Sequence, residues 1–311
     1  MSVPLRVVAV VVNWNGGEAN LACIRSLLAG GVDSADLVFV DNGSTDGSRE
    51  LVARAFPSIT RIENALNLGF GEAANQGAAA GLARGAGAVF FVNNDVVVPP
   101  ETLPRLVLEL SRARDVGIVG PRVLYMHDRS LVWCAGGMLT WRQNLSTLLG
   151  HQQVDGPEWR VTREVDYVAG CALLARRELL EEVGLFDARY FAYMEDVDLC
   201  LRASQRGYKV EVIGDVAAFH ASSSATGGGY NPRRKYMMGV NSVWFLKRHA
   251  KFPQWLRFVA FDVASLPFLW FAGLFQGRAK SVLAKAIGIV DGLRGKRVTG
   301  ESIRAGGSWL W

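Results

Sequence analysis

Several features that define large protein classes are scarce or missing in this sequence. It has only four cysteines, none of them in a CxxC pair, so neither a disulfide framework nor a zinc site is indicated. The loop after the first apolar run is not G-x-G-x-x-G, and no G-x-x-x-x-G-K-[ST] phosphate loop occurs, which argues against a dehydrogenase or a P-loop enzyme. No small-residue cleavage site follows the N-terminal apolar run, so we interpret that run as a strand and expect a reducing, cytosolic compartment.

Apolar residues and glycine are plentiful instead, and the charge is unevenly distributed. Half of the 311 residues are apolar and 34 are glycine, which is typical of a globular chain with a large core. The net charge of +5 conceals a basic end, because residues 229–311 carry 14 Lys and Arg against 3 Asp and Glu. Such a segment favours an anionic partner, namely a membrane surface, a phosphorylated lipid or nucleic acid. Base-stacking motifs for RNA are missing, so we expect no nucleic acid.

Short apolar runs that end in polar, often glycine-bearing loops recur through the first 120 residues. Val7–Val12, Leu37–Val40 and Ala88–Val92 are such runs, and amphipathic or Ala/Gly-rich segments lie between them. Unbroken apolar runs are typical of strands buried on both faces of a parallel sheet, and their alternation with helices predicts a doubly wound α/β fold. Because ligands bind beyond the carboxyl ends of such strands, the loops at 13–17, 41–47 and 93–95 should converge on one crevice.

The polar residues that end these runs are the first candidates for a site. Ala88–Val92 is followed by Asn93, Asn94 and Asp95, which are either crevice residues or simply a polar turn, since Asn and Asp are ordinary turn residues. Asp41 ends the second run, where a carboxylate can accept hydrogen bonds from a base or a ribose. Residues 121–168 show no clean period, so we expect hairpins and loops there, serving either acceptor recognition or a surface cover.

Two further stretches, both after residue 168, contain candidate functional groups. Glu195, Asp196 and Asp198 begin a predicted helix directly after an aromatic run, and three acids in four residues exceed what the helix dipole alone favours. His220 ends a predicted strand and precedes a Ser/Gly-rich stretch, residues 222–229, whose composition is that of a mobile lid. The alternative for the three acids is that they only complement the helix dipole. The alternative for His220 is a purely structural role.

The basic C-terminal segment is rich in aromatic residues. A helix is predicted over Tyr230–Ala250, and Phe258–Phe275 is almost wholly apolar apart from Asp262. Eighteen residues is short for a membrane span, and a charge at the bilayer centre costs about 2.5–3.5 kcal/mol, so we favour an in-plane or re-entrant amphipathic anchor. The alternative is a helix packed on the catalytic domain. We expect residues 300–311, with two tryptophans at the end, to be loosely ordered.

The motifs together resemble those of the inverting glycosyltransferase family 2, most closely its rhamnosyltransferase-type members. The resemblance covers about residues 5–250 and is carried, in order, by VVNWNG at 11–16, VDNGSTDGS at 40–48, NLGFGEAANQG at 67–77, FVNNDVVV at 91–98 and FAYMEDVDLCLRASQRGY at 191–208. It implies the GT-A fold, a Rossmann-like doubly wound mixed sheet, here followed by a helical basic extension. It implies a catalytic domain over 1–228, with a nucleotide-sugar half to about 120 and an acceptor half after it. The basic and apolar composition of residues 229–311 predicts a separate membrane-associating segment.

The resemblance also implies roles for single residues. Asp196 would be the catalytic base, next to Glu195, and Asp41 would contact the nucleotide base. Asn93 replaces the first acid of the family's Asp-x-Asp metal motif, so Asp95 is the one charged ligand there, and His220 matches the position of a further metal ligand for Mg²⁺ or Mn²⁺. The nucleotide-sugar pocket would be lined by Asn13, Asn15, Asp41, Asn67, Gly69, Asn75, Asn93, Asn94 and Asp95.

The implied activity is transfer of one or a few sugars, because the Q-x-x-R-W motif of processive synthases is absent after Leu201. We expect a dTDP- or UDP-sugar donor, with dTDP-rhamnose first, and a glycan or polyprenyl-diphosphate-linked saccharide acceptor of the cell envelope. The protein would be peripheral on the inner face of the plasma membrane. The alternatives are a sugar nucleotidyltransferase, for which VVNWNGG offers no basic residue to hold a triphosphate, and a non-catalytic scaffold that binds lipid through its basic end.

Overall fold

The computed structural model describes residues 5–221, 230–304 and 306–311, and it divides into two compact units. Unit 1 comprises Met1–Met138, Leu148–Asp187 and Asp196–Ala225, and unit 2 comprises Leu139–Thr147, Ala188–Glu195 and Thr226–Trp311. The second unit therefore includes two short segments, Leu139–Thr147 and Ala188–Glu195, that lie in sequence between segments of the first unit. The lid predicted at residues 222–229 and the domain boundary predicted at residue 228 lie outside the described residues, and both stay predictions.

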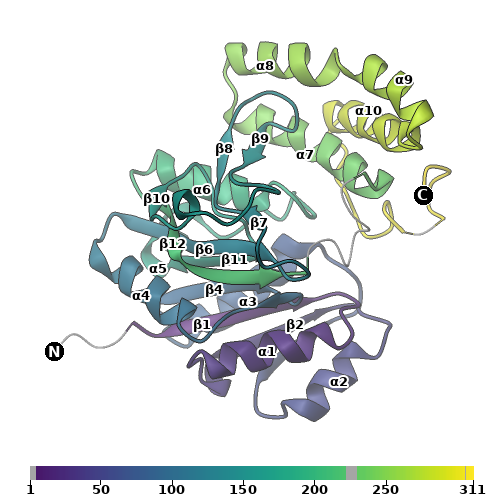
Figure 1. Ribbon diagram of the computed structural model, residues 1–311. Coiled ribbons are helices and arrows are strands. Elements are labelled where there is room, and N and C mark those ends of the chain that lie inside the picture. The colour runs from purple at the N-terminus through teal and green to yellow at the C-terminus, as the bar shows by residue number, and fades with distance from the viewer. Residues whose placement is uncertain (1–4, 222–229, 305) are drawn as a thin grey trace. The chain divides into compact units, whose positions relative to one another are not determined.

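Unit 1 is built on one mixed sheet with the strand order β10-β12-β6-β11-β4-β1-β2-β3, which confirms the predicted α/β class (Figure 1). Strands β1, β2, β3 and β4 are parallel, whereas β11 runs antiparallel to both β4 and β6. The order reverses at β1, which has β2 on one side and β4 on the other, so a ligand is expected beyond the carboxyl ends of these strands. The strands of this sheet are β1 (Val7–Asn13), β2 (Leu37–Asn42), β3 (Thr60–Asn64), β4 (Ala88–Asn93), β5 (Val96–Val97), β6 (Val116–Tyr125), β7 (Val132–Cys134), β10 (Arg163–Glu164), β11 (Ala172–Arg176) and β12 (Lys209–His220), with β5 paired to β12 and β7 to β6. The strands β8 (Gly137–Leu139) and β9 (Ser146–Leu148) form a separate two-stranded sheet.

The core of unit 1 lies on both faces of β1, as its unbroken apolar sequence predicts. Val8 and Val10 point toward α3, where Gly81 and Gly77 leave no room for a side chain, so the helix packs closely on the strand. The alternate residues Ala9 and Val11 belong to the core cluster on the other face. The helices of this unit are α1 (Ala19–Ala29), α2 (Ser48–Ala55), α3 (Phe70–Ala83), α4 (Thr102–Arg112), α5 (Arg177–Val183) and α6 (Glu195–Gln205), with short 3₁₀ turns at Ser34–Asp36 and Pro157–Trp159.

Two strands are longer than the sequence pattern indicates. β6 continues to Tyr125 instead of ending at Gly120, because Pro121 is accommodated beside a shift in register between β6 and β12. The predicted strands Lys209–Ile213 and Val216–Phe219 form one strand, β12, with an irregularity after Ile213. A β-bulge of this kind bends a strand without ending it, which apolar periodicity alone does not reveal.

Unit 2 is helical, with α7 (Pro232–His249), α8 (Phe252–Phe258), α9 (Leu266–Phe275) and α10 (Ala279–Leu293). Gly239 of α7 faces the backbone of α10, and Gly288 of α10 faces the backbone of α7, so these two helices pack at close range. Trp311 lies against Tyr236, with ring centroids 5.4 Å apart, and Leu310 is buried in the same cluster. The end of the chain is therefore packed, and the expectation of a loosely ordered terminus was wrong.

The apolar stretch of unit 2 is one helical segment, broken in its regularity by a π-helical turn at Val259–Val263. Among the residues that the structure describes, Phe252–Phe275 is the one helical segment long and apolar enough to cross a membrane. Asp262, within this segment, is fully buried and forms an ion pair with Lys285. Its other carboxylate oxygen accepts a hydrogen bond from the backbone N–H of Asn144 at 3.0 Å. Its charge is thus compensated inside the unit.

Candidate active site

Asn13, the last residue of β1, connects three strand-end loops of unit 1. Its side chain is fully buried, and its amide nitrogen lies 2.8 Å from Asp41 Oδ1 and 2.8 Å from Ser48 Oγ. Its amide oxygen accepts hydrogen bonds from the Gly16 backbone N–H at 3.1 Å and from Asn94 Nδ2 at 2.9 Å. A β-carbon at Gly16 would collide with both Asn13 and Asn94, so glycine is required there. The predicted convergence of the three loops is therefore confirmed.

Asn15 and Asp41 order the loop that follows β2. The Asn15 side-chain oxygen accepts a hydrogen bond from the Thr45 backbone N–H at 2.8 Å, and Asn15 itself has a positive φ of 53°. Asp41 is fully buried, and its second oxygen accepts the Ser44 backbone N–H at 3.1 Å. Both residues thus shape the wall where a nucleotide base was predicted to lie. Direct contact of Asp41 with a base stays a prediction.

Asn67 and Gly69 lie in the neighbouring loop, at the start of α3. The Asn67 side-chain oxygen accepts hydrogen bonds from Asn42 Nδ2 at 3.0 Å and from the Gly69 backbone N–H at 2.9 Å. Gly69 has φ 91° and ψ 162°, a conformation that is essentially restricted to glycine. Asn75 instead exchanges two hydrogen bonds with the backbone of Phe186, at 2.8 and 3.0 Å, and so fixes a distant segment against α3.

Asp95 and His220 are brought together by a two-residue strand. Val96 of β5 pairs with His220 of β12, and the Ala221 backbone N–H donates to the Asp95 carbonyl at 3.0 Å. The two side chains are almost fully buried, and His220 Nε2 lies 3.2 Å from Asp95 Oδ1. The ring of Trp133 packs edge-on against the imidazole, with centroids 4.6 Å apart. The residues proposed from sequence as metal ligands therefore form one pair.

The donor set of this pair suits a divalent cation that shares its coordination with a substrate. Cis ligands of an octahedral ion with bonds of about 2.1 Å lie about 3 Å apart, close to the 3.2 Å observed between Asp95 and His220. The ring nitrogen that such a cation would use is His220 Nε2, because this atom faces Asp95. The described residues contain no cluster of three or more His, Cys, Asp and Glu side chains suited to a metal. Among the described residues, the metal ligands predicted from sequence are therefore limited to this one pair.

Asp196, the second residue of α6, is held by two backbone N–H groups. Its Oδ2 accepts a hydrogen bond from Gly170 at 2.9 Å and its Oδ1 accepts one from Val197 at 2.8 Å. Burial raises the pKa of the Asp196 carboxyl above its ordinary value, although these hydrogen bonds oppose the shift. A raised pKa brings a carboxylate closer to the proton affinity that a general base needs near neutral pH.

The segment before β11 places this carboxylate near the motif that ends β4. Gly170 binds Asp196, and the next residue, Cys171, accepts a hydrogen bond through its carbonyl from the Asn93 backbone N–H at 3.0 Å. Burial raises the pKa of the Cys171 thiol, and the neighbouring Cys134, Asp95 and Asp196 raise it further. Sequence reasoning missed Gly170, Cys171 and Trp133. A small-residue AGC before an apolar run was their one visible signal.

The turn that leads into α6 is strained. Tyr193 and Met194 both have positive φ values, 72° and 74°, which side-chain-bearing residues rarely adopt. Asn241 of α7 donates hydrogen bonds from Nδ2 to the carbonyls of Ala192 and Tyr193, each at 2.8 Å. Such strain persists where surrounding contacts enforce it, and it is common beside functional groups. Glu195, which follows this turn, is almost fully buried.

Comparison with known sequences places these motifs among glycosyltransferases. The family model described as Glycosyl transferase family 2 matches residues 8–184. The N-acetylglucosaminyl-diphospho-decaprenol L-rhamnosyltransferase of Mycobacterium tuberculosis is 29% identical over 238 residues, which cover 70% of this chain and 76% of the relative. Rhamnosyltransferase WbbL of Escherichia coli is 38% identical over 79 residues, 25% of this chain and 29% of that protein.

Comparison with solved structures shows the fold. A mannosyltransferase from Pyrobaculum calidifontis, solved with GDP-mannose and Mn²⁺, superposes with a TM-score of 0.58 at 18% identity, covering 94% of this chain and 88% of that one. Residues 1–349 of TarS from S. aureus superpose with a TM-score of 0.52 at 16% identity, covering 94% and 92%. The predicted GT-A architecture with a helical C-terminal region is confirmed.

Proposed function

Because the chain belongs to glycosyl transferase family 2, we propose that it transfers a sugar from a nucleotide-diphosphate donor with inversion at the anomeric carbon. One observation carries this proposal: backbone hydrogen bonds of Gly170 and Cys171 connect Asp196 to the end of β4, and the loop that follows contains Asp95 of the buried Asp95–His220 pair. Family membership favours transfer over the nucleotidyltransferase and scaffold alternatives.

We propose dTDP-rhamnose as the donor and a lipid-linked saccharide of the cell envelope as the acceptor. The relative in Mycobacterium tuberculosis is named as a rhamnosyltransferase acting on a diphospho-decaprenol, and the E. coli relative as a rhamnosyltransferase. These names support both choices, and a UDP-sugar donor or a free glycan acceptor are the variants to test.

Asp95 and His220 are the residues that would hold Mg²⁺ or Mn²⁺ together with the donor diphosphate. A cation bound there would neutralise the charge that develops on the diphosphate as it leaves. The mannosyltransferase with the similar fold was solved with Mn²⁺, which supports this assignment. Asn93 and Asn94 carry no charge, so the protein contributes a single carboxylate to the motif.

Asp196 is the proposed base. The acceptor hydroxyl must lose its proton as its oxygen attacks the anomeric carbon, and attack from the side opposite the leaving diphosphate inverts that carbon. The two N–H groups that bind Asp196 fix the orientation of its carboxylate, while burial keeps its pKa raised. A positioned base of this kind contributes a factor of about 10²–10⁴ to the rate. Glu195 is proposed as its neighbour in the catalytic motif.

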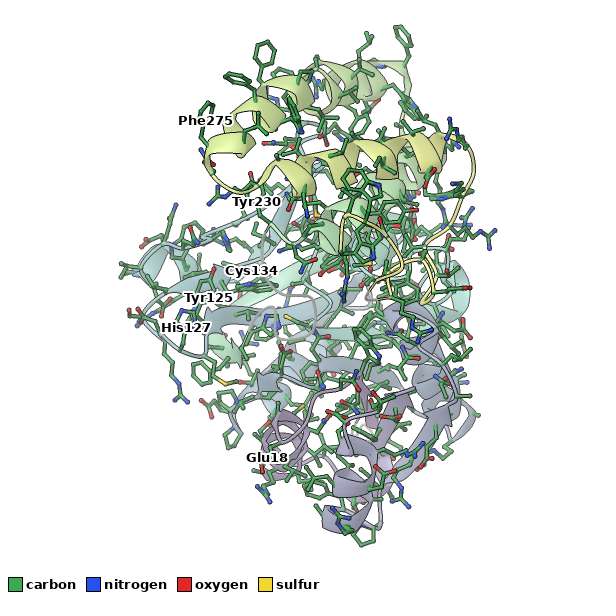
Figure 2. The ribbon with its side chains drawn as sticks, turned by 90° about the vertical axis from the view of Figure 1, so that its right-hand side faces the viewer. Glu18, Tyr125, His127, Cys134, Tyr230 and Phe275 are labelled. Atoms are coloured by element: carbon green, nitrogen blue, oxygen red, sulfur yellow. The ribbon has the colours of Figure 1, made fainter. Side chains whose placement is uncertain are left out.

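We further propose that unit 2 binds the membrane surface, so that the protein is peripheral on its cytoplasmic face. The segment Phe252–Phe275 exposes a row of large apolar side chains, including Phe275 at the end of α9 (Figure 2). The ion pair of Asp262 with Lys285 ties this segment to α10, which favours an in-plane anchor over a span. The exposed aromatic and apolar residues are Phe252, Leu256, Val259, Phe261, Phe268, Trp270, Phe271, Leu274 and Phe275.

The test is a transfer assay with purified protein, Mn²⁺, a polyprenyl-diphosphate-linked sugar and one donor at a time. Mass spectrometry should detect addition of rhamnose from dTDP-rhamnose, and NMR of the product should show the anomeric configuration inverted relative to the donor. Transfer from a UDP-sugar alone would correct the donor. A retained configuration would contradict the proposed mechanism.

A further inference from the structure

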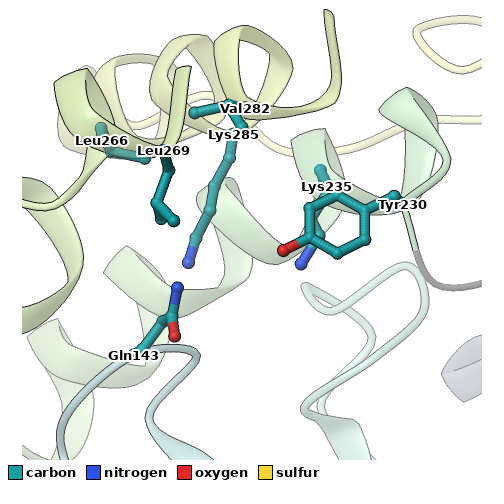
Figure 3. A pocket seen from close by; sticks show the side chains of 7 residues that line it. All are labelled: Gln143, Tyr230, Lys235, Leu266, Leu269, Val282 and Lys285. Atoms are coloured by element: carbon teal, nitrogen blue, oxygen red, sulfur yellow. The ribbon is translucent and has the colours of Figure 1, made fainter. Parts of the chain in front are cut away.

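A small pocket in unit 2 gathers positively charged and hydrogen-bonding groups against an apolar wall. Figure 3 shows the ammonium groups of Lys235 and Lys285 and the hydroxyl of Tyr230 directed toward the same space, with Gln143 beneath Lys285. The other lining residues, Leu266, Leu269 and Val282, are apolar and come from α9 and α10. The pocket therefore combines donors for an anion with a surface for hydrocarbon.

The charge in this pocket is only partly compensated. Lys285 is paired with Asp262 and donates to Asn144 Oδ1 at 2.9 Å. Lys235 has no carboxylate within ion-pair distance among the described residues, and its ammonium lies 4.7 Å from the centre of the Tyr230 ring. Arg278 lies 4.5 Å from the same ring. Two cations thus contact one phenol ring, and the ion pairs found among the described residues include neither of them.

Two further properties mark Lys235 as a group that needs an anion. Burial and the nearby charges of Lys285 and Arg234 lower the pKa of Lys235 to about 8. Lys235 also lies in the first turn of α7 with Arg233 and Arg234, and no acid occurs in that turn. Cations at a helix N-terminus oppose the helix dipole, whereas an anion there is stabilised. Three cations without an acid in the first turn of α7 are therefore unfavourable for the helix itself, and local departures of this kind are common at functional sites.

The apolar wall of the pocket continues into an exposed apolar surface on α9. Leu266 and Leu269 line the pocket from α9, and the same helix exposes Phe268 by 79% and Phe271 by 61%. A ligand with a phosphate head and a hydrocarbon tail matches both parts. A free phosphate matches only the first.

We propose that this pocket binds the phosphate of a lipid ester, with Lys235 as its principal charged contact and the hydrocarbon chain along α9. The lipid is either an anionic phospholipid of the membrane or the diphosphate-linked carrier of the acceptor, since both present the same group. This inference rests on the proposed membrane partner of unit 2 and not on the chemistry at Asp196.

The experiment is vesicle binding by the full chain and two charge-matched variants. The vesicles contain phosphatidylcholine alone, phosphatidylcholine with phosphatidylglycerol, or phosphatidylcholine with a polyprenyl diphosphate. Lys235→Gln removes the pocket charge without leaving a carboxylate unpaired, and Lys280→Gln removes an exposed charge of the same unit. Tyr230→Phe serves as a second pocket variant. Circular dichroism and a melting curve verify that each variant is folded.

Lys235→Gln should weaken binding to vesicles that contain phosphatidylglycerol or the polyprenyl diphosphate at least about tenfold, as expected for a lost charge-assisted hydrogen bond. Lys280→Gln should weaken it by about fivefold or less, the effect of one charge near an anionic surface. The vesicle for which Lys235→Gln loses more affinity than Lys280→Gln identifies the bound lipid. Equal losses of affinity in the two variants would contradict lipid binding in this pocket, while still agreeing with membrane binding by unit 2. If the wild-type protein binds none of the vesicles, both this inference and the proposed membrane binding of unit 2 are wrong. The proposed transferase activity is tested separately, by nucleotide binding and by the transfer assay.

Discussion

The strand-end loops of unit 1 bury polar side chains, whereas the helices of unit 2 expose large apolar side chains. In the loops, polar side chains such as Asn13 and Asp41 are fully buried and are bonded to one another. In unit 2, large aromatic side chains such as Phe268 and Phe275 are about four-fifths exposed, at 79% and 80%. Buried polar networks hold a defined geometry for a small ligand, whereas an exposed apolar row suits an extended apolar partner.

Each region also contains a buried pair of an acidic and a basic side chain. Asp95 and His220 of unit 1 lie 3.2 Å apart. Asp262 and Lys285 of unit 2 are enclosed by further hydrogen bonds from and to Asn144. We propose that the first pair holds a cation together with the donor, whereas the second ties helices together. The predictions below test this contrast, from the largest effect to the smallest.

Asp196→Asn should lower the turnover number by about 10²–10⁴ while leaving donor binding unchanged, because the amide cannot accept the acceptor's proton. Steady-state transfer rates and calorimetric titration with the nucleotide measure the two effects. Asp198→Asn is a poor control, since Asp198 is paired with Arg202, so Glu182→Gln on the exposed surface serves instead. Ordinary turnover in the Asp196 variant would remove the base assignment.

His220→Asn should weaken Mn²⁺-dependent binding of the nucleoside diphosphate by about 10- to 100-fold, because the site loses an imidazole ligand. Binding measured in the presence of a chelator should not change. His127→Asn, which removes an exposed imidazole of the same unit, should have no effect on either value. An unchanged metal dependence in the His220 variant would show that the Asp95–His220 pair is structural.

Lowering the pH should reduce the turnover number of the wild-type enzyme as the Asp196 carboxyl becomes protonated. Burial raises the pKa of this group, so the decline begins at a higher pH than for a free aspartate and approaches about tenfold per pH unit below that pKa. The residual rate of Asp196→Asn should not change across the same range. A parallel decline in the variant would assign the titration to another group.

Replacing Phe268 and Phe271 with serine should weaken binding to phosphatidylcholine vesicles at least about tenfold, because each buried phenyl ring contributes about 1.5–3 kcal/mol. Transfer to a soluble acceptor should be unaffected, since both rings lie in unit 2 and are exposed. Leu108→Ser, which removes an exposed apolar side chain from unit 1, is the control. Undiminished vesicle binding would contradict the role of α9.

Sequence patterns predict unit 1 well because its strands are buried on both faces and end in diagnostic loops. The runs at Val7–Val12 and Ala88–Val92 and the polar residues after them lie where the pattern indicates. The continuity of β6 and β12 was not predictable, because a register shift beside Pro121 leaves no periodic signal. The contact of Gly170 with Asp196 joins residues far apart in the chain through backbone atoms, which residue identity does not encode.

Sequence reasoning was weaker for unit 2, where tertiary pairing decides the outcome. From sequence, the charge of Asp262 appeared as a free-energy cost that opposes membrane insertion. In the structure, Lys285, 23 residues later, compensates this charge. The terminal Trp311 had no visible role, and it packs on Tyr236. Each of these contacts joins side chains from separate helices, and no spacing rule relates them. The assignment of unit 2 to a membrane partner therefore depends on exposed surface and not on pattern.

The most direct test of the central claim is the thermal stability of the purified protein with dTDP, UDP or GDP, each with and without Mn²⁺. A ligand at one hundred times its dissociation constant adds about 2.7 kcal/mol of stability, which raises the melting temperature measurably. The account predicts that dTDP raises it most, that the shift requires Mn²⁺, and that His220→Asn abolishes the metal dependence. Folded protein that shows no shift with any nucleotide would contradict the proposed donor site at Asp95 and His220.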